Sequence, residues 1–458
     1  MLLDQAFRPF IEKRPICVMA RGVLENLLNP QRLDELFKQT AERQYEHELL
    51  FSSLVALMSD VVLKIQPSVH AAYQSRKAEI PVSTTALYNK LNRVETRVSA
   101  ELVRDSARQA APVIEALDAC LSPWLPGYRC RLLDGNHLSA TEHRLEPLRN
   151  TWAAPLPGKV LVVLDPMRML ADDAFLTEDG HAQERSLLDE VIETIRPLDL
   201  WIADRNFCTF DFLAAIRRRQ ACFLIRQHGS IKGRLVGKRH RLGVTDTGVV
   251  YEQNMNIPDP DTGEDYVVRR ITVRLDQPTR DGDWEIHLLS NVPAEDADAV
   301  RLSELYRKRW TIETVFQEIT ETLACEIDTL AYPPAALFAF CLSLLAFNAV
   351  SVLKAALRSV HGEKTVTQNV SGYYLALEIH QAYDGMMVAL PAPLWQSLQA
   401  LQPAAMARWL KKVATSVRLS KYQKHPRGPK KKPPKKTAYR NGGHVSTAKL
   451  LRDSKQTC

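Results

Sequence analysis

The sequence predicts an α/β protein, in which a mixed sheet flanked by helices follows an all-helical region and precedes a basic tail. Residues 18–115 carry apolar side chains at helical spacing. Residues 128–228 alternate short apolar runs, as expected for buried strands, with helical segments. Residues 229–292 have the composition of strands, separated by turn signals such as PDPDTGED and PTRDGD.

The helical region is expected to form an N-terminal domain over residues 1–120. The apolar stretch LLFSSLVALMSDVVLK (49–64) predicts a helix buried between its neighbours. Ser83 begins a second segment, because the sequence TTALYNKLNRV after it predicts a capped helix. Its exposed side is expected to carry Asn89, Lys90, Asn92 and Arg93. A short turn before such a helix is compatible with helix-turn-helix DNA binding, and equally with an ordinary helix of an all-α bundle.

The first part of the sheet domain is expected over residues 121–228. Strands are predicted at 129–134, 159–165, 199–204, 221–226 and near 169–177, and helices at 184–196 and 209–219. Two strands, CRLLD and LWIAD, end on Asp134 and Asp204, where open α/β sheets keep their functional sites. Asp165 also ends a strand and is the main alternative metal ligand, but beside Pro166 it is expected to cap a turn.

The stretch LYRKRWTIETVFQEI (305–319) predicts one amphipathic helix. One face carries apolar side chains, whereas Tyr306, Arg309, Glu313 and Thr320 share another face. A carboxylate can ligate a divalent cation, and Arg and Tyr side chains suit phosphate oxygens. With the two strand-end aspartates, Glu313 predicts a cage for Mg²⁺, and two such ions can hold both reacting oxygens of a phosphodiester. The alternative is a surface helix with an internal ion pair.

Four segments resemble motifs of Asp-Asp-Glu transposases: DGN (134–136), ADRNF (203–207), LLSN (288–291) and YRKRWTIETVF (306–316). The most similar group is the bacterial insertion-sequence-4 family, whose signature is Tyr-x2-Arg-x3-Glu-x6-Lys. The resemblance covers residues 20 to 355, roughly. It implies a ribonuclease H-like core in which Asp134, Asp204 and Glu313 hold two Mg²⁺ ions, with Mn²⁺ as a substitute. Tyr306 and Arg309 would position phosphates, but the signature Lys is replaced by Thr320.

A β-rich insertion, also found in the resembled family, is expected over residues 229–292, before the second part of the core at 293–358. Its first segment fits either a flexible loop touching DNA phosphates or a solvated hairpin; the basic residues there are Lys232, Arg234, Lys238, Arg239 and Arg241. Arg226, at a strand end near the proposed cage, is expected to reach a phosphate. Relatives stack a Trp near the LLSN-like motif on a flipped base, and Trp284 is the candidate here.

The chain after the core is expected to contain C-terminal helices (359–415) and a disordered basic tail (416–458). The segment 336–353 approaches the length of a membrane span, but Asn348 interrupts it and two prolines precede it. We therefore expect a helix buried against the sheet and no membrane partner. The tail is expected to hold nucleic acid nonspecifically, with a solubilising role as the alternative.

The net charge of +7 conceals a strong asymmetry between the tail and the rest. From Lys411 onward there are 15 Lys and Arg and one acidic residue, so the other 410 residues carry 45 basic and 52 acidic groups. Any DNA-binding track on the body must be a local patch. The eight cysteines show no metal-ligand spacing, and the N-terminus lacks the apolar run of a signal peptide. These features favour a reducing cytosol, and the resemblance implies a bacterial cytoplasm, in association with the nucleoid.

The sequence thus predicts a cut-and-paste transposase acting on double-stranded DNA, both terminal inverted repeats and target. The resemblance implies a homodimer during synapsis. Two alternatives stay open: a ribonuclease H-like endonuclease without strand transfer, and a degenerate protein that binds DNA ends without cutting them. The sequence gives no indication of the terminal repeat, the target sequence or a hairpin intermediate.

Overall fold

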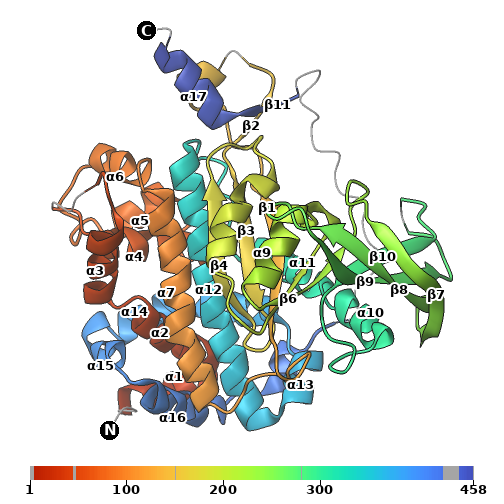
Figure 1. The fold of residues 1–458 in the computed structure, drawn as a ribbon. Helices are drawn as coiled ribbons and strands as arrows, with labels where there is room; N and C mark the ends of the chain where they lie inside the picture. The colour runs from red at the N-terminus through yellow and green to blue at the C-terminus, as the bar shows by residue number, and fades with distance from the viewer. Residues whose placement is uncertain (1–4, 45–47, 150, 280, 426–442, 457–458) are drawn as a thin grey trace.

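A nine-stranded mixed sheet forms the centre of the protein, and helices from both ends of the chain pack together beside it (Figure 1). The structure, a computed structural model, describes residues 5–44, 48–149, 151–279, 281–425 and 443–456.

Five neighbouring strands at one side of this sheet have the ribonuclease H-like arrangement, in the order β4-β3-β1-β5-β6. Strand β3 is antiparallel to β1 and β4, whereas β5 is parallel to both β1 and β6. The bounds are β1 Arg129–His137, β3 Lys159–Asp165, β4 Leu170–Thr177, β5 Asp199–Ala203 and β6 Cys222–Arg226. The predicted strands therefore coincide with these elements to within a few residues.

The insertion extends the same sheet in the order β10-β9-β8-β7, with β10 antiparallel to β6. These strands are β7 Arg234–Thr245, β8 Gly248–Pro258, β9 Asp265–Leu275 and β10 Glu285–Ser290. Of the two alternatives predicted for the segment Lys232–Arg241, the structure has the solvated hairpin, because most of the segment belongs to the exposed strand β7 and pairs antiparallel with β8. The pairing register shifts between Val236 and His240, where Gly237 has a φ of 72°.

The two faces of the sheet are buried in different hydrophobic clusters because side chains alternate along each strand. Leu132, Val162 and Ile202 belong to the larger cluster, which includes helices from both ends of the chain. Leu133 and Ala203 face a smaller cluster beneath two helices, α8 (Leu188–Glu193) and α9 (Phe210–Arg218).

The N-terminal and C-terminal helices share one core. Helix α2 contacts α14, α15 and α16, and the indole of Trp409 fills the space where a Cβ at Gly22 would lie. The N-terminal helices are α1 Arg8–Lys13, α2 Pro15–Leu27, α3 Pro30–Thr40, α4 Phe51–Val62, α5 Val69–Ser75, α6 Thr84–Leu91 and α7 Thr96–Ala116. The C-terminal helices are α13 Glu363–Asn369, α14 Gly372–Ala389, α15 Gln396–Gln399 and α16 Pro403–Ala414.

Helix α12 (Pro333–His361) is the buried helix that the sequence predicts. It is the one described helix long and apolar enough to cross a membrane, but its most apolar 18-residue window is fully buried inside the protein. Asn348 on this helix accepts a hydrogen bond from Ala171 N (2.8 Å) and donates to Ala171 O (3.0 Å) and to Ser106 Oγ (2.8 Å). A polar residue at the centre of this helix therefore joins it to β4 and α7 (Figure 1).

The prediction of a disordered tail over 416–458 was wrong for its described parts. The tail contains a 3₁₀ turn (Leu419–Tyr422), a strand β11 (His444–Ser446) and a helix α17 (Thr447–Gln456). Strand β11 is held in place because it pairs in parallel with β2 (Ala154–Leu156). Residues 426–442, which hold most of the predicted basic run, lie outside the described residues.

Candidate active site

Asp134 and Asp204 occupy matching positions on neighbouring parallel strands. The pairing of β1 with β5 ends at Leu133↔Ala203. The residue that follows Leu133 is Asp134, and the residue that follows Ala203 is Asp204. Asp134 continues in β1, whereas Asp204 begins a 3₁₀ turn, η4 (Arg205–Phe207). The strand register therefore brings together two carboxylates that are 70 residues apart in the sequence.

The stretch predicted as one helix forms two. Helix α10 (Ala299–Arg307) contacts β7 and β8, and α11 (Trp310–Thr322) contacts β1 and α14. Lys308 and Arg309 lie between them in a tight turn, where Arg309 N donates to Tyr306 O at 2.9 Å. The sequence predicted one helix because the apolar residues keep helical spacing through this turn. That prediction was wrong, because α10 and α11 pack against different parts of the protein.

Arg309 is the centre of the site. Its Nη1 lies 3.1 Å from Asp134 Oδ2, and its Nη2 lies 2.7 Å from Glu313 Oε1. The side chain is buried, with a residue exposure of 6%. Burial alone would lower the pKa of Arg309, but Tyr306, Asp134 and Asp204 outweigh burial and raise it. The guanidinium of Arg309 thus joins Asp134 to Glu313, and the charge of Asp204 also acts on it.

Asp134 is a buried carboxyl whose pKa is raised despite its contact with Arg309. Burial raises the pKa of Asp134 to about 6, and the charges of Glu313 and Asp204 add to that rise. Arg309 and the Gly135 N–H, which donates to Oδ1 at 2.9 Å, oppose it. A carboxyl that resists ionisation beside two other acidic side chains is a common feature of catalytic and cation-binding sites.

The donor chemistry of the site suits a hard divalent cation, because Asp134, Asp204 and Glu313 offer carboxylate oxygens only. Across the described residues, no group of three or more His, Cys, Asp or Glu side chains is arranged to hold a metal ion. The predicted cage is therefore not assembled as a set of ligands. The physical reason is that Arg309 bridges Asp134 and Glu313 and supplies the positive charge between them.

Two other residues of the predicted helical face have different surroundings. Tyr306 is buried at 9% exposure, and burial raises its pKa, so its hydroxyl remains protonated and able to donate. Thr320 is exposed, and its hydroxyl donates to Phe316 O at 2.9 Å within its own helix. The position of the signature Lys therefore contributes no cation to the site.

Of the other predicted DNA-binding residues, Arg226 ends core strand β6 at the position that matches Asp204 after β5, and the rest belong to the insertion. Arg226 forms an ion pair with Asp283 (2.8 Å) and is close enough to Tyr306 to influence its pKa. Arg239 pairs with Glu285 at 2.8 Å and lies over the ring of Tyr251. The other three are exposed: Lys238 and Arg241 on the edge strand β7, and Trp284 (59% exposed) just before the interior strand β10.

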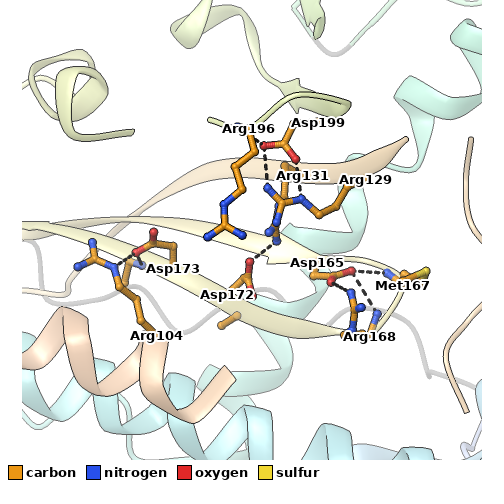
Figure 2. Close-up of polar contacts among 12 residues, drawn as sticks. Arg104, Arg129, Arg131, Asp165, Met167, Arg168, Asp172, Asp173, Arg196 and Asp199 are labelled. Atoms are coloured by element: carbon orange, nitrogen blue, oxygen red, sulfur yellow. Dashed lines mark hydrogen bonds and ion pairs between the residues drawn. The ribbon is translucent and has the colours of Figure 1, made fainter. Parts of the chain in front are cut away.

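Asp165, the alternative metal ligand, caps a turn as predicted. Its Oδ1 accepts from Met167 N (2.9 Å) and Arg168 N (3.2 Å), and its Oδ2 pairs with Arg168 Nη1 at 2.7 Å (Figure 2). Figure 2 shows it among further ion pairs near the start of β1, including Arg129 with Asp199 and Arg104 with Asp173. Every oxygen of Asp165 is thus committed to its own turn.

Sequence reasoning missed Trp310 as a candidate. Its ring is 61% exposed and lies 5.4 Å from the Arg309 guanidinium carbon, at the first position of α11. An exposed indole beside a carboxylate site is suited to stack on a nucleobase. The signal was its place in the motif, next to Arg309, but helical periodicity alone gave it no special role.

Residues 125–349 match the family model of the transposase DDE domain. A search of curated proteins finds no match. Among solved structures, the chain is similar to piggyBac transposase in a synaptic complex with hairpin DNA, with a TM-score of 0.41 and 10% identity, over 88% of this chain and 85% of that chain.

The family match spans both strand-end aspartates, the insertion and the helix that carries Glu313. DDE domains work with divalent metal ions, which fits the carboxylate donors of this site. The chain therefore carries a transposase DDE domain over residues 125–349, and its enzymatic activity is that of a DDE transposase.

Proposed function

We propose that this transposase acts by a cut-and-paste route, cleaving at the ends of an insertion sequence of the insertion-sequence-4 group and joining them to target DNA. The observation that carries the proposal is the cluster in which Arg309 contacts both Asp134 and Glu313 while Asp204 lies within electrostatic range. In the signature of that group, Tyr306, Arg309 and Glu313 have matching spacing, and only the Lys position departs.

Asp134, Asp204 and Glu313 would hold two Mg²⁺ ions, with Mn²⁺ as a substitute. When bound, such ions lower the pKa of water and stabilise charge on phosphodiester oxygens. The protein's own residues hold and orient the DNA: buried Tyr306 offers a hydroxyl donor, and Arg309, once released from a carboxylate, offers a guanidinium to a phosphate oxygen. Exposed Trp310 offers a stacking surface for a base at the entrance.

Two basic or polar surfaces are candidates for holding the DNA ends. A surface cavity of about 890 Å³ is lined by Asn89, Asn92 and Arg93 beside α6, where Ser83 caps the helix as predicted. Lys90 also lines this cavity and is half-buried, with its Nζ donating to Leu49 O at 2.5 Å. The second surface is strand β7, with exposed Lys238 and Arg241. Phosphate contacts on both would align the duplex with the carboxylates.

The partner and location proposals follow from the same activity. Synapsis of two ends would require a homodimer with double-stranded DNA from the terminal repeats and the target. The seven cysteines of the described chain are free, which supports a reducing compartment such as the bacterial cytoplasm and its nucleoid.

The test is to incubate the protein with labelled element ends, a target plasmid and Mg²⁺. Joined products would support the proposal, nicks without joining would support an endonuclease, and mobility shifts without cleavage would support a degenerate binding protein. The hydroxyl of Thr320, bonded to its own helix, is the observation that keeps the last alternative under test. Asp204→Asn should bind the same DNA and give no product, and cleavage by this variant would contradict the site.

A further inference from the structure

The two aspartate-bearing segments are linked behind the site by one more acidic side chain. Glu184 begins a 3₁₀ turn, η3 (Glu184–Leu187), immediately before α8. Its Oε2 accepts a hydrogen bond from Asn206 Nδ2 at 2.5 Å, and its side chain is only 15% exposed. Asn206 lies in η4, two residues after Asp204, so this bond restrains the turn into which Asp204 leads.

The neighbouring residue strengthens the same contact. Arg185 Nε donates to the backbone carbonyl of Asn206 at 2.6 Å. Asn206 is therefore held by its side chain through Glu184 and by its backbone through Arg185. A three-residue 3₁₀ turn has few hydrogen bonds of its own, so these two contacts supply much of its restraint.

On its other side, Glu184 packs directly against β1. A Cβ built on Gly135, the residue after Asp134, would lie 2.4 Å from Glu184 Oε1 and 2.5 Å from Glu184 Cδ. Glu184 Oε1 also lies 3.7 Å from His137 Nδ1 on the same strand. The carboxylate thus occupies the space that only a glycine at position 135 leaves open.

We propose that Glu184 is a positioning residue, which sets the separation of Asp134 and Asp204 by bridging Gly135 on one segment and Asn206 on the other. This inference rests on the proposed function, in which those aspartates hold divalent cations. Residues that orient metal ligands without touching the metal typically change metal affinity or activity by about 10–100-fold when replaced. Glu184 itself is assigned no contact with DNA or metal.

The first experiment measures DNA-end cleavage against Mg²⁺ concentration for Glu184→Ala, Glu184→Gln and the matched control Glu190→Ala, an exposed acidic residue on α8. Glu184→Ala should raise the half-saturating Mg²⁺ concentration about tenfold or more, while DNA binding measured without cleavage stays unchanged. Glu184→Gln, which keeps an acceptor for Asn206, should recover most of the loss, and the control should match wild type. A purely structural role would lower the thermal midpoint without moving the metal requirement, and that result would overturn the proposal.

The second experiment uses the tight contact at Gly135. Gly135→Ala should raise the metal requirement in the wild-type background, because the new methyl group displaces the carboxylate. In the Glu184→Ala background the same change should have little further effect, because the space is already vacant. Equal losses in both backgrounds would contradict the bridge.

Asp204→Asn separates failure of this inference from failure of the proposed function. If Asp204→Asn abolishes cleavage while Glu184→Ala has a wild-type metal requirement, only the positioning role is wrong. If Asp204→Asn still cleaves, the carboxylate site itself is wrong.

Discussion

At the scale of single residues, Arg309 links the acidic side chains of the candidate site. Its guanidinium contacts Asp134 and Glu313 and lies within the field of Asp204. Divalent cations held by Asp134, Asp204 and Glu313 would supply the positive charge that Arg309 supplies to these carboxylates, and the guanidinium would then be available to a phosphate. Arg309 is thus expected to alternate between the carboxylates and DNA.

The first prediction is that Arg309→Gln destabilises the metal-free protein more than the metal-bound protein. Removing one partner of a buried ion pair costs roughly 3–5 kcal/mol, and the partial exposure of Glu313 places this case at about 2 kcal/mol. Denaturant unfolding with a chelator and with Mg²⁺ measures both states. Arg307→Gln, exposed on α10, is the control, and an equal loss with and without Mg²⁺ would count against the account.

The second prediction concerns pH. The pKa of Asp134 is raised to about 6 by burial and by its acidic neighbours, so below that pH the metal-free carboxyl holds a proton that a cation must displace. Metal affinity should therefore be flat above pH 6 and fall by about tenfold per pH unit below it. Metal titrations at a series of pH values measure this. An affinity that stays constant from neutral pH down to the pKa of an ordinary aspartate would contradict the assignment.

At the scale of elements, the sequence predicted the strands that consist of short apolar runs. Strands β1, β3, β5 and β6 were predicted because each is a buried run bounded by turn or charged residues. The break at Lys308 and Arg309 was not predicted, because the apolar stripe keeps its helical spacing through the turn. Strand β7 was predicted only as one of two alternatives, because most of its residues are exposed and no alternation of apolar and polar residues marks it.

The sequence also did not predict the pairings that depend on distant partners. Strand β11 is short, and its pairing partner β2 lies about 290 residues earlier in the chain. The bridging contact of Arg309 was also not predicted. Its spacing of four residues from Glu313 is visible in the sequence, but its contact with Asp134 depends on how strand β1 packs against α11. Local pattern therefore gave the candidate site residues, while the folded chain determined their contacts.

The third prediction belongs to α12. Asn348→Ala removes the partners of Ala171 N–H, Ala171 C=O and Ser106 in a fully buried position. Each buried polar group left without a partner costs about 1–3 kcal/mol, so the free energy of unfolding should fall by about 2–4 kcal/mol. Denaturant unfolding measures it, with Asn89→Ala on the exposed side of α6 as the control. A loss no greater than that of the control would show that α12 is not anchored through Asn348.

At the scale of the whole molecule, the two ends of the chain pack against each other. Its N-terminal and C-terminal helices share one hydrophobic core with α12 and one face of the sheet. The insertion continues the sheet instead of forming a separate body, so the exposed basic residues of β7 are connected to the catalytic strands through paired strands.

The fourth prediction concerns the C-terminal strand. Removing residues 443–458 should leave the core folded but expose the backbone of β2, because β11 pairs with Ala154–Leu156 and Ala154 N donates to Gly443 O at 3.1 Å. Hydrogen exchange should accelerate at Ala154 and Leu156 and stay unchanged in β1 and β5. Unchanged exchange in β2 would show that β11 contributes nothing to its order.

The most direct test of the central claim is to locate Mn²⁺ by anomalous diffraction in crystals of the protein bound to cleaved element ends. The account predicts two peaks with carboxylate ligands from Asp134, Asp204 and Glu313 at about 2.0–2.2 Å, and Arg309 turned from the carboxylates toward a phosphate. Peaks bound by other residues, or Arg309 still joined to Asp134 and Glu313 in a complex that has cleaved its DNA, would contradict it.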